Sequence, residues 1–338
     1  AANFVCSRVV ISKETPLYDP NKVFCAAVGS AVVPGLNGQA IQEIAHRLDP
    51  RGDAHGDLYR WTNAKDCGLS SVFPATVLVH ERLNNDPELV EEITNFWSGQ
   101  KLSIQRIRQG LRQVGAQHLY QVKAVPLREL GNQRFLFASR LIHAAGYAGW
   151  VLLIDEVELI GRYSLLQRGR SYAELARWLG KIDTLQCPGL VAVAAITDDF
   201  ALYVLTEKDD ERSLGPKLRE KGTEELATTA ARAEIGMRAI KKNSLRLSAP
   251  DTELLRQTCE KVRTVHAVAH AWEPPSLVAD AADGSRPMRA HVRRWINEWD
   301  LRRMYPAVTP ATEELEVRTD YGEDKTLEET PEDDEAAE

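Results

Sequence analysis

Three short apolar runs predict buried strands. They cover residues 4–11, 150–154 and 190–196, and each is bounded by polar residues. Strands that are apolar on both faces are typical of a parallel sheet covered by helices on both sides. The pattern therefore predicts an α/β core. A fourth short strand is predicted at residues 244–247.

Between and after these strands, apolar residues recur at helical spacing. Helices are predicted over Pro87–Trp97, with Asp86 as N-cap, and over residues 128–147, 250–271 and 287–303. Another begins at Ser171, where residues 171–174 have the form of a capping box. The helical stretch at about 57–125 is too long for one crossover, which indicates an insertion between strands.

This pattern predicts an α/β core over residues 1–248, a helical region over 249–305 and a tail over 306–338. Residues 311–338 hold 13 of the 49 acidic and 2 of the 42 basic side chains, so residues 1–310 carry 40 basic against 36 acidic groups. With few apolar anchors, the tail is expected to be disordered. We interpret it as a solubilising terminus, with a contact to a basic partner as the alternative.

Composition narrows the class of protein. Hydrophobic residues make up 43% of the chain and charged residues 27%, as in globular proteins. The longest mostly apolar stretch is about a dozen residues, too short for a bilayer, so no membrane association is expected. Five widely separated cysteines favour reduced thiols in the cytoplasm over a disulfide framework.

The candidate chemistry begins at the second strand. Residues 151–156, Val-Leu-Leu-Ile-Asp-Glu, have the form of a Walker B element. In that interpretation Asp155 holds Mg²⁺, usually through water, and Glu156 is the catalytic base that orients water against the γ-phosphate of ATP. The alternative is a buried strand whose polar end reaches solvent.

Thr197 follows the next apolar strand, where a sensor-1 residue would contact the γ-phosphate; it also suits a helix N-cap. Arg286, Arg289 and Arg293 form one stripe on the last predicted helix. Arg286 suits a sensor-2 role, with Arg289 as second choice. A solvated basic face, or a contact with nucleic-acid phosphates, is the alternative for this stripe.

No Gly-x-x-x-x-Gly-Lys-Ser/Thr loop occurs in residues 1–338. In P-loop proteins this Walker A loop follows the first strand and precedes the second. If residues 4–11 form the second strand, the first strand and Walker A would lie before Ala1. The chain also begins without an initiator Met, so we expect a truncated P-loop fold.

Other patterns are weaker. His266 and His270 have the i, i+4 spacing of a metal pair, but no third ligand is evident, so helix-surface histidines are the expectation. Arg168 and Arg170 are candidates for arginines that act across a subunit boundary. The simpler interpretation is that they lie in a surface loop.

The sequence around the Walker B element resembles a bacterial family of P-loop ATP-binding proteins associated with BREX-type bacteriophage-exclusion systems. The resemblance rests on residues 149–164 and 170–180. Residues 2–10, 14–23 and 288–301 also look like parts of that family.

The resemblance implies ATP binding, with ATP and Mg²⁺ as cofactors, and a role in phage defence. It implies an AAA+-like fold with residues 249–305 as a helical lid. Other phage-defence proteins are the expected partners, and DNA and further copies of the chain are candidates. The first hypothesis is an ATPase of such a complex; the alternatives are a nucleotide-dependent binding switch and a non-catalytic α/β interaction module.

Overall fold

The computed structural model describes residues 3–36, 40–49, 52–182, 187–277, 287–307 and 319–327. The chain forms two compact units. The first unit comprises Ala1–Ser244 together with Asp320–Glu338, and the second unit comprises Leu245–Thr319. Each unit has its own buried apolar cluster.

The first unit is built on a parallel sheet. Its strands are β1 (Phe4–Val10), β2 (Gly149–Asp155) and β3 (Leu190–Ala194), in the order β1-β2-β3. The register places Val10 beside Asp155 and Ile154 beside Ala194. The prediction of an α/β core with a parallel sheet is confirmed.

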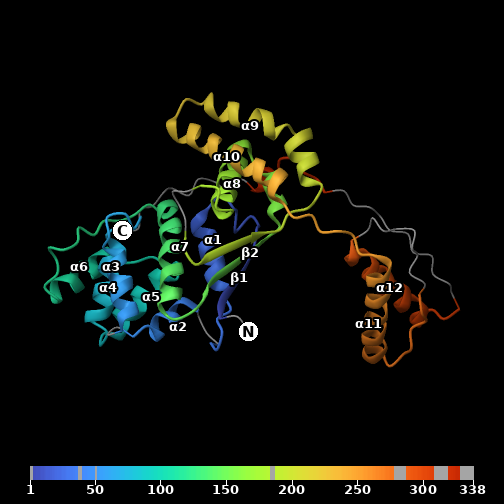
Figure 1. Ribbon diagram of the computed structural model, residues 1–338, viewed down its shortest axis with the longest axis horizontal. Helices are drawn as coiled ribbons and strands as arrows, with labels where there is room; N and C mark the ends of the chain where they lie inside the picture. The colour runs from blue at the N-terminus through green and yellow to red at the C-terminus, as the bar shows by residue number, and fades with distance from the viewer. Residues whose placement is uncertain are drawn as a thin grey trace. The chain divides into compact units, whose positions relative to one another are not determined.

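Helices cover one face of this sheet. α1 (Pro20–Gly29) and α7 (Leu127–Ala144) lie against the strands (Figure 1). The ring of Trp150 on β2 packs against Phe24 of α1 at 6.3 Å and Phe135 of α7 at 5.5 Å between centroids. Aromatic packing of this kind anchors both helices to β2.

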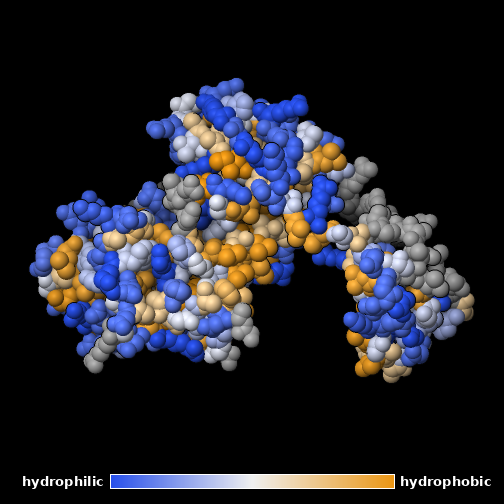
Figure 2. Space-filling view, in the orientation of Figure 1, coloured by the Kyte–Doolittle hydropathy of each residue, from blue (hydrophilic) through white to orange (hydrophobic). Residues whose placement is uncertain are grey.

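The other face is exposed in the described part of the chain. Its side chains alternate with the buried ones along each strand, as a pleated sheet requires. Among them, Leu153 is 43% exposed, Val191 58% and Val193 54%. Figure 2 shows apolar surface where Figure 1 draws β1 and β2. The expectation of helices on both faces is therefore wrong for the described residues.

The stretch between β1 and β2 is helical. It contains α2 (Ala40–Arg47), α3 (Asp53–Thr62), α4 (Val72–Arg82), α5 (Pro87–Trp97) and α6 (Ile104–Gln113). α5 begins as predicted: the Asp86 carboxylate accepts a hydrogen bond from the backbone N–H of Leu89 at 3.1 Å. α2 and α3 contact α7, which separates this group from the sheet (Figure 1).

A second group of helices follows β2. It contains η1 (Val157–Arg162), α8 (Leu165–Trp178), the π-helix η3 (Ala201–Glu207), α9 (Asp210–Arg219) and α10 (Glu224–Asn243). The predicted start of a helix at Ser171 is wrong. α8 begins at Leu165 with a capping box formed by Ser164 and Gln167, and Ser171 is buried inside the helix.

The second unit contains α11 (Thr252–His270) and α12 (Met288–Met304), close to the two predicted helices. In the described part of this unit, the buried apolar cluster is small and consists of Leu255, Cys259, Trp295 and Trp299. The strand predicted at residues 244–247 is absent: this segment is exposed and has no regular structure.

The tail was expected to be disordered, but residues 320–327 are ordered against the first unit. This segment, which ends in η4 (Lys325–Leu327), packs on the first unit, and Tyr321 is buried there. Tyr321 and the partly buried Leu327 pack against the core of the first unit and supply the apolar anchors that tail composition as a whole lacks. Among the described residues, no helix has the length and apolar character needed to cross a membrane.

Candidate functional site

The two carboxylates singled out in the sequence lie at the carboxyl end of β2. Asp155 is the last residue of the strand, and Glu156 follows in the left-handed region with φ 60° and ψ 33°. The Asp155 Oδ1 atom accepts a hydrogen bond from the backbone N–H of Glu156 at 3.0 Å. Non-glycine residues in this conformation are uncommon and cluster at functional sites. The turn leaves the Glu156 side chain exposed.

Arg8 joins this site from the neighbouring strand. Its Nη2 atom lies 2.8 Å from Oδ2 of Asp155, and the two side chains are 66% and 38% exposed. An exposed ion pair contributes little to stability and exchanges readily. The sequence analysis missed Arg8, because only the register of β1 against β2 brings it to Asp155.

A third carboxylate, Glu158, was also missed. Burial raises its pKa, and the negative charges of Glu156 and Asp155 act in the same direction. Backbone hydrogen bonds from Glu158 itself and from Thr197 lower this pKa and so oppose the shift. The sequence contained this information, because the segment Asp-Glu-Val-Glu places a further carboxylate two residues beyond Glu156.

Backbone hydrogen bonds hold the ends of β2 and β3 side by side. The N–H of Ala195 donates to the carbonyl of Ile154 at 2.8 Å, and that of Val157 donates to the carbonyl of Ala195 at 3.2 Å. Thr197 follows two residues later and is half-buried. It is not a helix N-cap, because η3 begins at Ala201 with Phe200 as its cap residue.

Thr197 is instead bonded to the C-terminal segment. Its Oγ1 atom lies 2.8 Å from the hydroxyl of Tyr321, which donates to Oδ1 of Asp199, also at 2.8 Å. Burial and the Asp199 carboxylate raise the pKa of Tyr321 to about 12, although the bond with Thr197 opposes the shift. The phenol therefore keeps its proton at neutral pH.

Several contacts fix Tyr321 in this place. Its ring packs on Gly161, where an added Cβ would lie 2.6 Å from Tyr321 Cδ1, and stands edge-on to Phe200 at 5.8 Å. The ammonium group of Lys208 donates to the carbonyls of Tyr321 at 2.8 Å and Gly161 at 2.7 Å. A glycine is required at position 161 for this close approach.

A buried arginine holds the next part of the segment. Nη1 of Arg168 lies 2.7 Å from Oε1 of Glu323, and its Nε lies 2.9 Å from Oδ2 of Asp210. Arg168 is only 4% exposed. Neither the surface-loop interpretation nor a role across a subunit boundary fits this residue, and Arg170 also lies within α8. The sequence did not reveal the carboxylate partners of Arg168, because they come from α9 and from the tail.

The predicted lid arginines belong to the second unit. Arg286 lies outside the described residues, and Arg289 is an exposed residue in the first turn of α12. Trp295 and Trp299 of the same helix are buried.

No curated protein and no solved structure matches this chain. A family model does: residues 134–288 match the BREX system ATP-binding protein BrxC/D. The matched stretch runs from α7 to the first residue of α12 and contains Asp155, Glu156 and Thr197. This match confirms the resemblance to a BREX-associated family of ATP-binding proteins.

Proposed function

We propose that this chain provides the magnesium-binding and water-orienting side of an ATPase site in a BREX-type phage-defence complex. The observation that carries the proposal is the edge formed by the ends of β2 and β3. Asp155 and Glu156 lie at the end of β2 and Thr197 follows β3, so all three belong to the carboxyl edge of a parallel sheet. Ligands of open α/β sheets bind at this carboxyl edge of the strands.

The donor set fits a hydrated Mg²⁺ ion. This ion keeps several waters and takes one or two carboxylates. Both oxygens of Asp155 already accept hydrogen bonds from the protein, so Asp155 is placed to hold the ion through water. The partly exposed Arg8 must release Oδ2 for direct binding. When bound, Mg²⁺ would neutralise phosphate charge.

The remaining roles follow from the side chains. The exposed carboxylate of Glu156 would accept a hydrogen bond from the attacking water. The hydroxyl of Thr197 would contact the γ-phosphate after exchanging its bond with Tyr321. A role for Arg286 or Arg289 at the γ-phosphate stays a prediction.

The phosphates also need a cradle of backbone N–H groups and a lysine, which no motif in residues 1–338 supplies. The outer edge of β1 is engaged at Cys6, which exchanges two backbone hydrogen bonds with Val32. In the described residues the outer edge of β3 pairs with no strand, and the sheet face beside it is exposed. We propose that a further strand carrying a P-loop pairs with β3 and completes this AAA+-like fold.

One observation favours the nucleotide-dependent switch as a second candidate. Thr197 has a protein partner, Tyr321, which phosphate binding would displace, and direct binding of Mg²⁺ to Asp155 would displace Arg8. Occupancy of the site would then alter the contacts of β1 and of the C-terminal segment. In this case partner binding would follow ATP occupancy, and turnover would be incidental.

The test uses Glu156→Gln and Asp155→Ala in this chain together with the proposed strand that carries the P-loop. Removing a catalytic base should lower ATP turnover by about 100-fold or more and leave ATP affinity near the parental value. Asp155→Ala should weaken Mg²⁺-dependent binding instead. Turnover by steady-state phosphate release and affinity by calorimetry separate the two effects.

Glu220→Gln is the control, because Glu220 is an exposed carboxylate at the end of α9. Parental turnover by Glu156→Gln would refute the assignment of a base. Robust Mg²⁺-dependent hydrolysis by residues 1–338 alone would refute the need for a further strand.

A further inference from the structure

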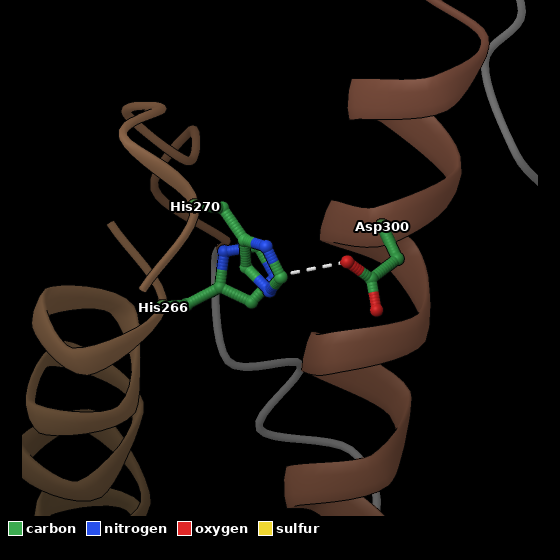
Figure 3. A group of neighbouring side chains, drawn as sticks. All are labelled: His266, His270 and Asp300. Atoms are coloured by element: carbon green, nitrogen blue, oxygen red, sulfur yellow. Dashed lines mark hydrogen bonds and ion pairs between the residues drawn. The ribbon is translucent and has the colours of Figure 1, made fainter. Parts of the chain in front are cut away.

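A second cluster of chemically active side chains lies in the second unit, between α11 and α12. His266 and His270 project from α11, and Asp300 projects from α12 toward them (Figure 3). One ligand atom from each of the three residues lies within 4.8 Å of the others. The helix spacing of the histidines supplies two ligands, and the tertiary structure adds the third.

The contacts within this cluster are close. The Nε2 atom of His266 lies 3.1 Å from Oδ1 of Asp300, and the two imidazole rings have centroids 4.5 Å apart. His266 is only 5% exposed, and its Nδ1 atom has no hydrogen-bond partner in the described part of the chain. A buried imidazole with a carboxylate at one nitrogen and no partner at the other is incompletely bonded, and such a group in a folded protein needs an explanation.

We propose that His266, His270 and Asp300 bind a divalent transition-metal ion of the zinc class. Two imidazole nitrogens and one carboxylate oxygen form a recognised donor set for Zn²⁺, with water as the fourth ligand of a tetrahedron. The donor set carries one negative charge, which favours a dication. Arg303, whose Nη2 lies 3.3 Å from Oδ1 of Asp300, is half-buried and must yield to the ion.

The size of the second unit supplies an independent reason for such a site. Within its described residues the buried apolar cluster has four members, and α11 leaves Val265 69% and Val268 81% exposed. Helical units with so little core usually need a metal, a disulfide or a partner to become stable. An ion bound by residues from both helices would join α11 to α12 and stabilise their contact.

The test measures Zn²⁺ binding to the whole chain after treatment with a chelator. Calorimetry should find a tight site with about one Zn²⁺ per chain, and Co²⁺ should give the visible absorption of a tetrahedral ion. His270→Ala should weaken binding by about tenfold or more. His270 is exposed, so this variant leaves the buried cluster intact. Asp300→Asn should give the same result.

His143→Ala is the matched control, because His143 is an exposed histidine in the last turn of a helix of the first unit. It should bind Zn²⁺ as the parent does. The proposal is overturned by a parent without a stoichiometric site. It is equally overturned if His270→Ala and Asp300→Asn keep the parental affinity, since the ion would then lie elsewhere.

Discussion

At the scale of single residues, the hydroxyl proton of Tyr321 determines which hydrogen bond the Thr197 hydroxyl donates. Asp199 has only acceptors to offer, so the phenol donates to it and the phenolic oxygen accepts from Thr197. The hydroxyl proton of Thr197 is therefore occupied while Tyr321 is docked. A phosphate that binds Thr197 has to compete with Tyr321 for this proton.

Tyr321→Phe tests this pair of bonds. The ring and its packing on Gly161 remain, whereas Thr197 and Asp199 each lose a partner. We expect the free energy of unfolding to fall by about 1–2 kcal/mol, as measured by urea denaturation. Tyr305→Phe, at a tyrosine that is 59% exposed, should change it little. Equal values for both variants would contradict the importance of these bonds.

At the scale of elements, α4 and α5 pack through an aromatic contact that depends on a neutral histidine. The rings of His80 on α4 and Trp97 on α5 have centroids 5.0 Å apart. Burial lowers the pKa of His80 to about 4, and the neighbouring His55 and His46 act in the same direction. The indole N–H of Trp97 donates to Thr76 at 3.0 Å, which fixes its ring against α4.

This histidine makes stability depend on pH. His80 has a pKa of about 6.5 when unfolded and about 4 when folded, so below pH 6.5 the unfolded chain binds the extra proton. Stability should fall as pH drops from about 6.5 to 4, by up to about 3 kcal/mol from this residue.

Urea denaturation of the parent and His80→Gln across this range measures the effect. In the variant, the free energy of unfolding should change less with pH. The change that remains would come in part from His55, because burial also lowers its pKa. His118→Gln, at an exposed histidine, is the control and should keep the parental slope. A parental slope in His80→Gln would show that His80 does not carry the effect.

At the scale of the whole molecule, the uncovered face of the sheet governs association. Val191 and Val193 alternate along β3 on the exposed side, beside an edge that pairs with no strand in the described residues. Apolar surface next to an unpaired strand edge favours pairing with another chain. The edge that would receive the further strand, with the apolar face beside it, is thus also a surface for self-association.

Val193→Lys should reduce self-association of residues 1–338, because a charge on an edge strand opposes edge-to-edge pairing. Sedimentation velocity at increasing protein concentration provides the measurement. Val268→Lys is the matched control, since Val268 is 81% exposed on α11. If the two variants associate alike, the sheet face is not the contact surface.

The sequence alone was sufficient for features that arise from local pattern. Apolar runs identified the three strands, and Asp86 with Pro87 identified the start of α5, because side-chain burial and capping act over a few residues. The carboxylates of Asp155 and Glu156 were found for the same reason, since they end an apolar run.

The partners of those residues were decided by the tertiary structure. Arg8 meets Asp155 through strand register, Tyr321 reaches Thr197 from far along the chain, and Asp300 joins two histidines from another helix. Each contact links residues that are between 34 and 147 positions apart. Periodicity reports which face of an element is buried, but the geometry between elements depends on packing of the whole core, which a local pattern does not contain.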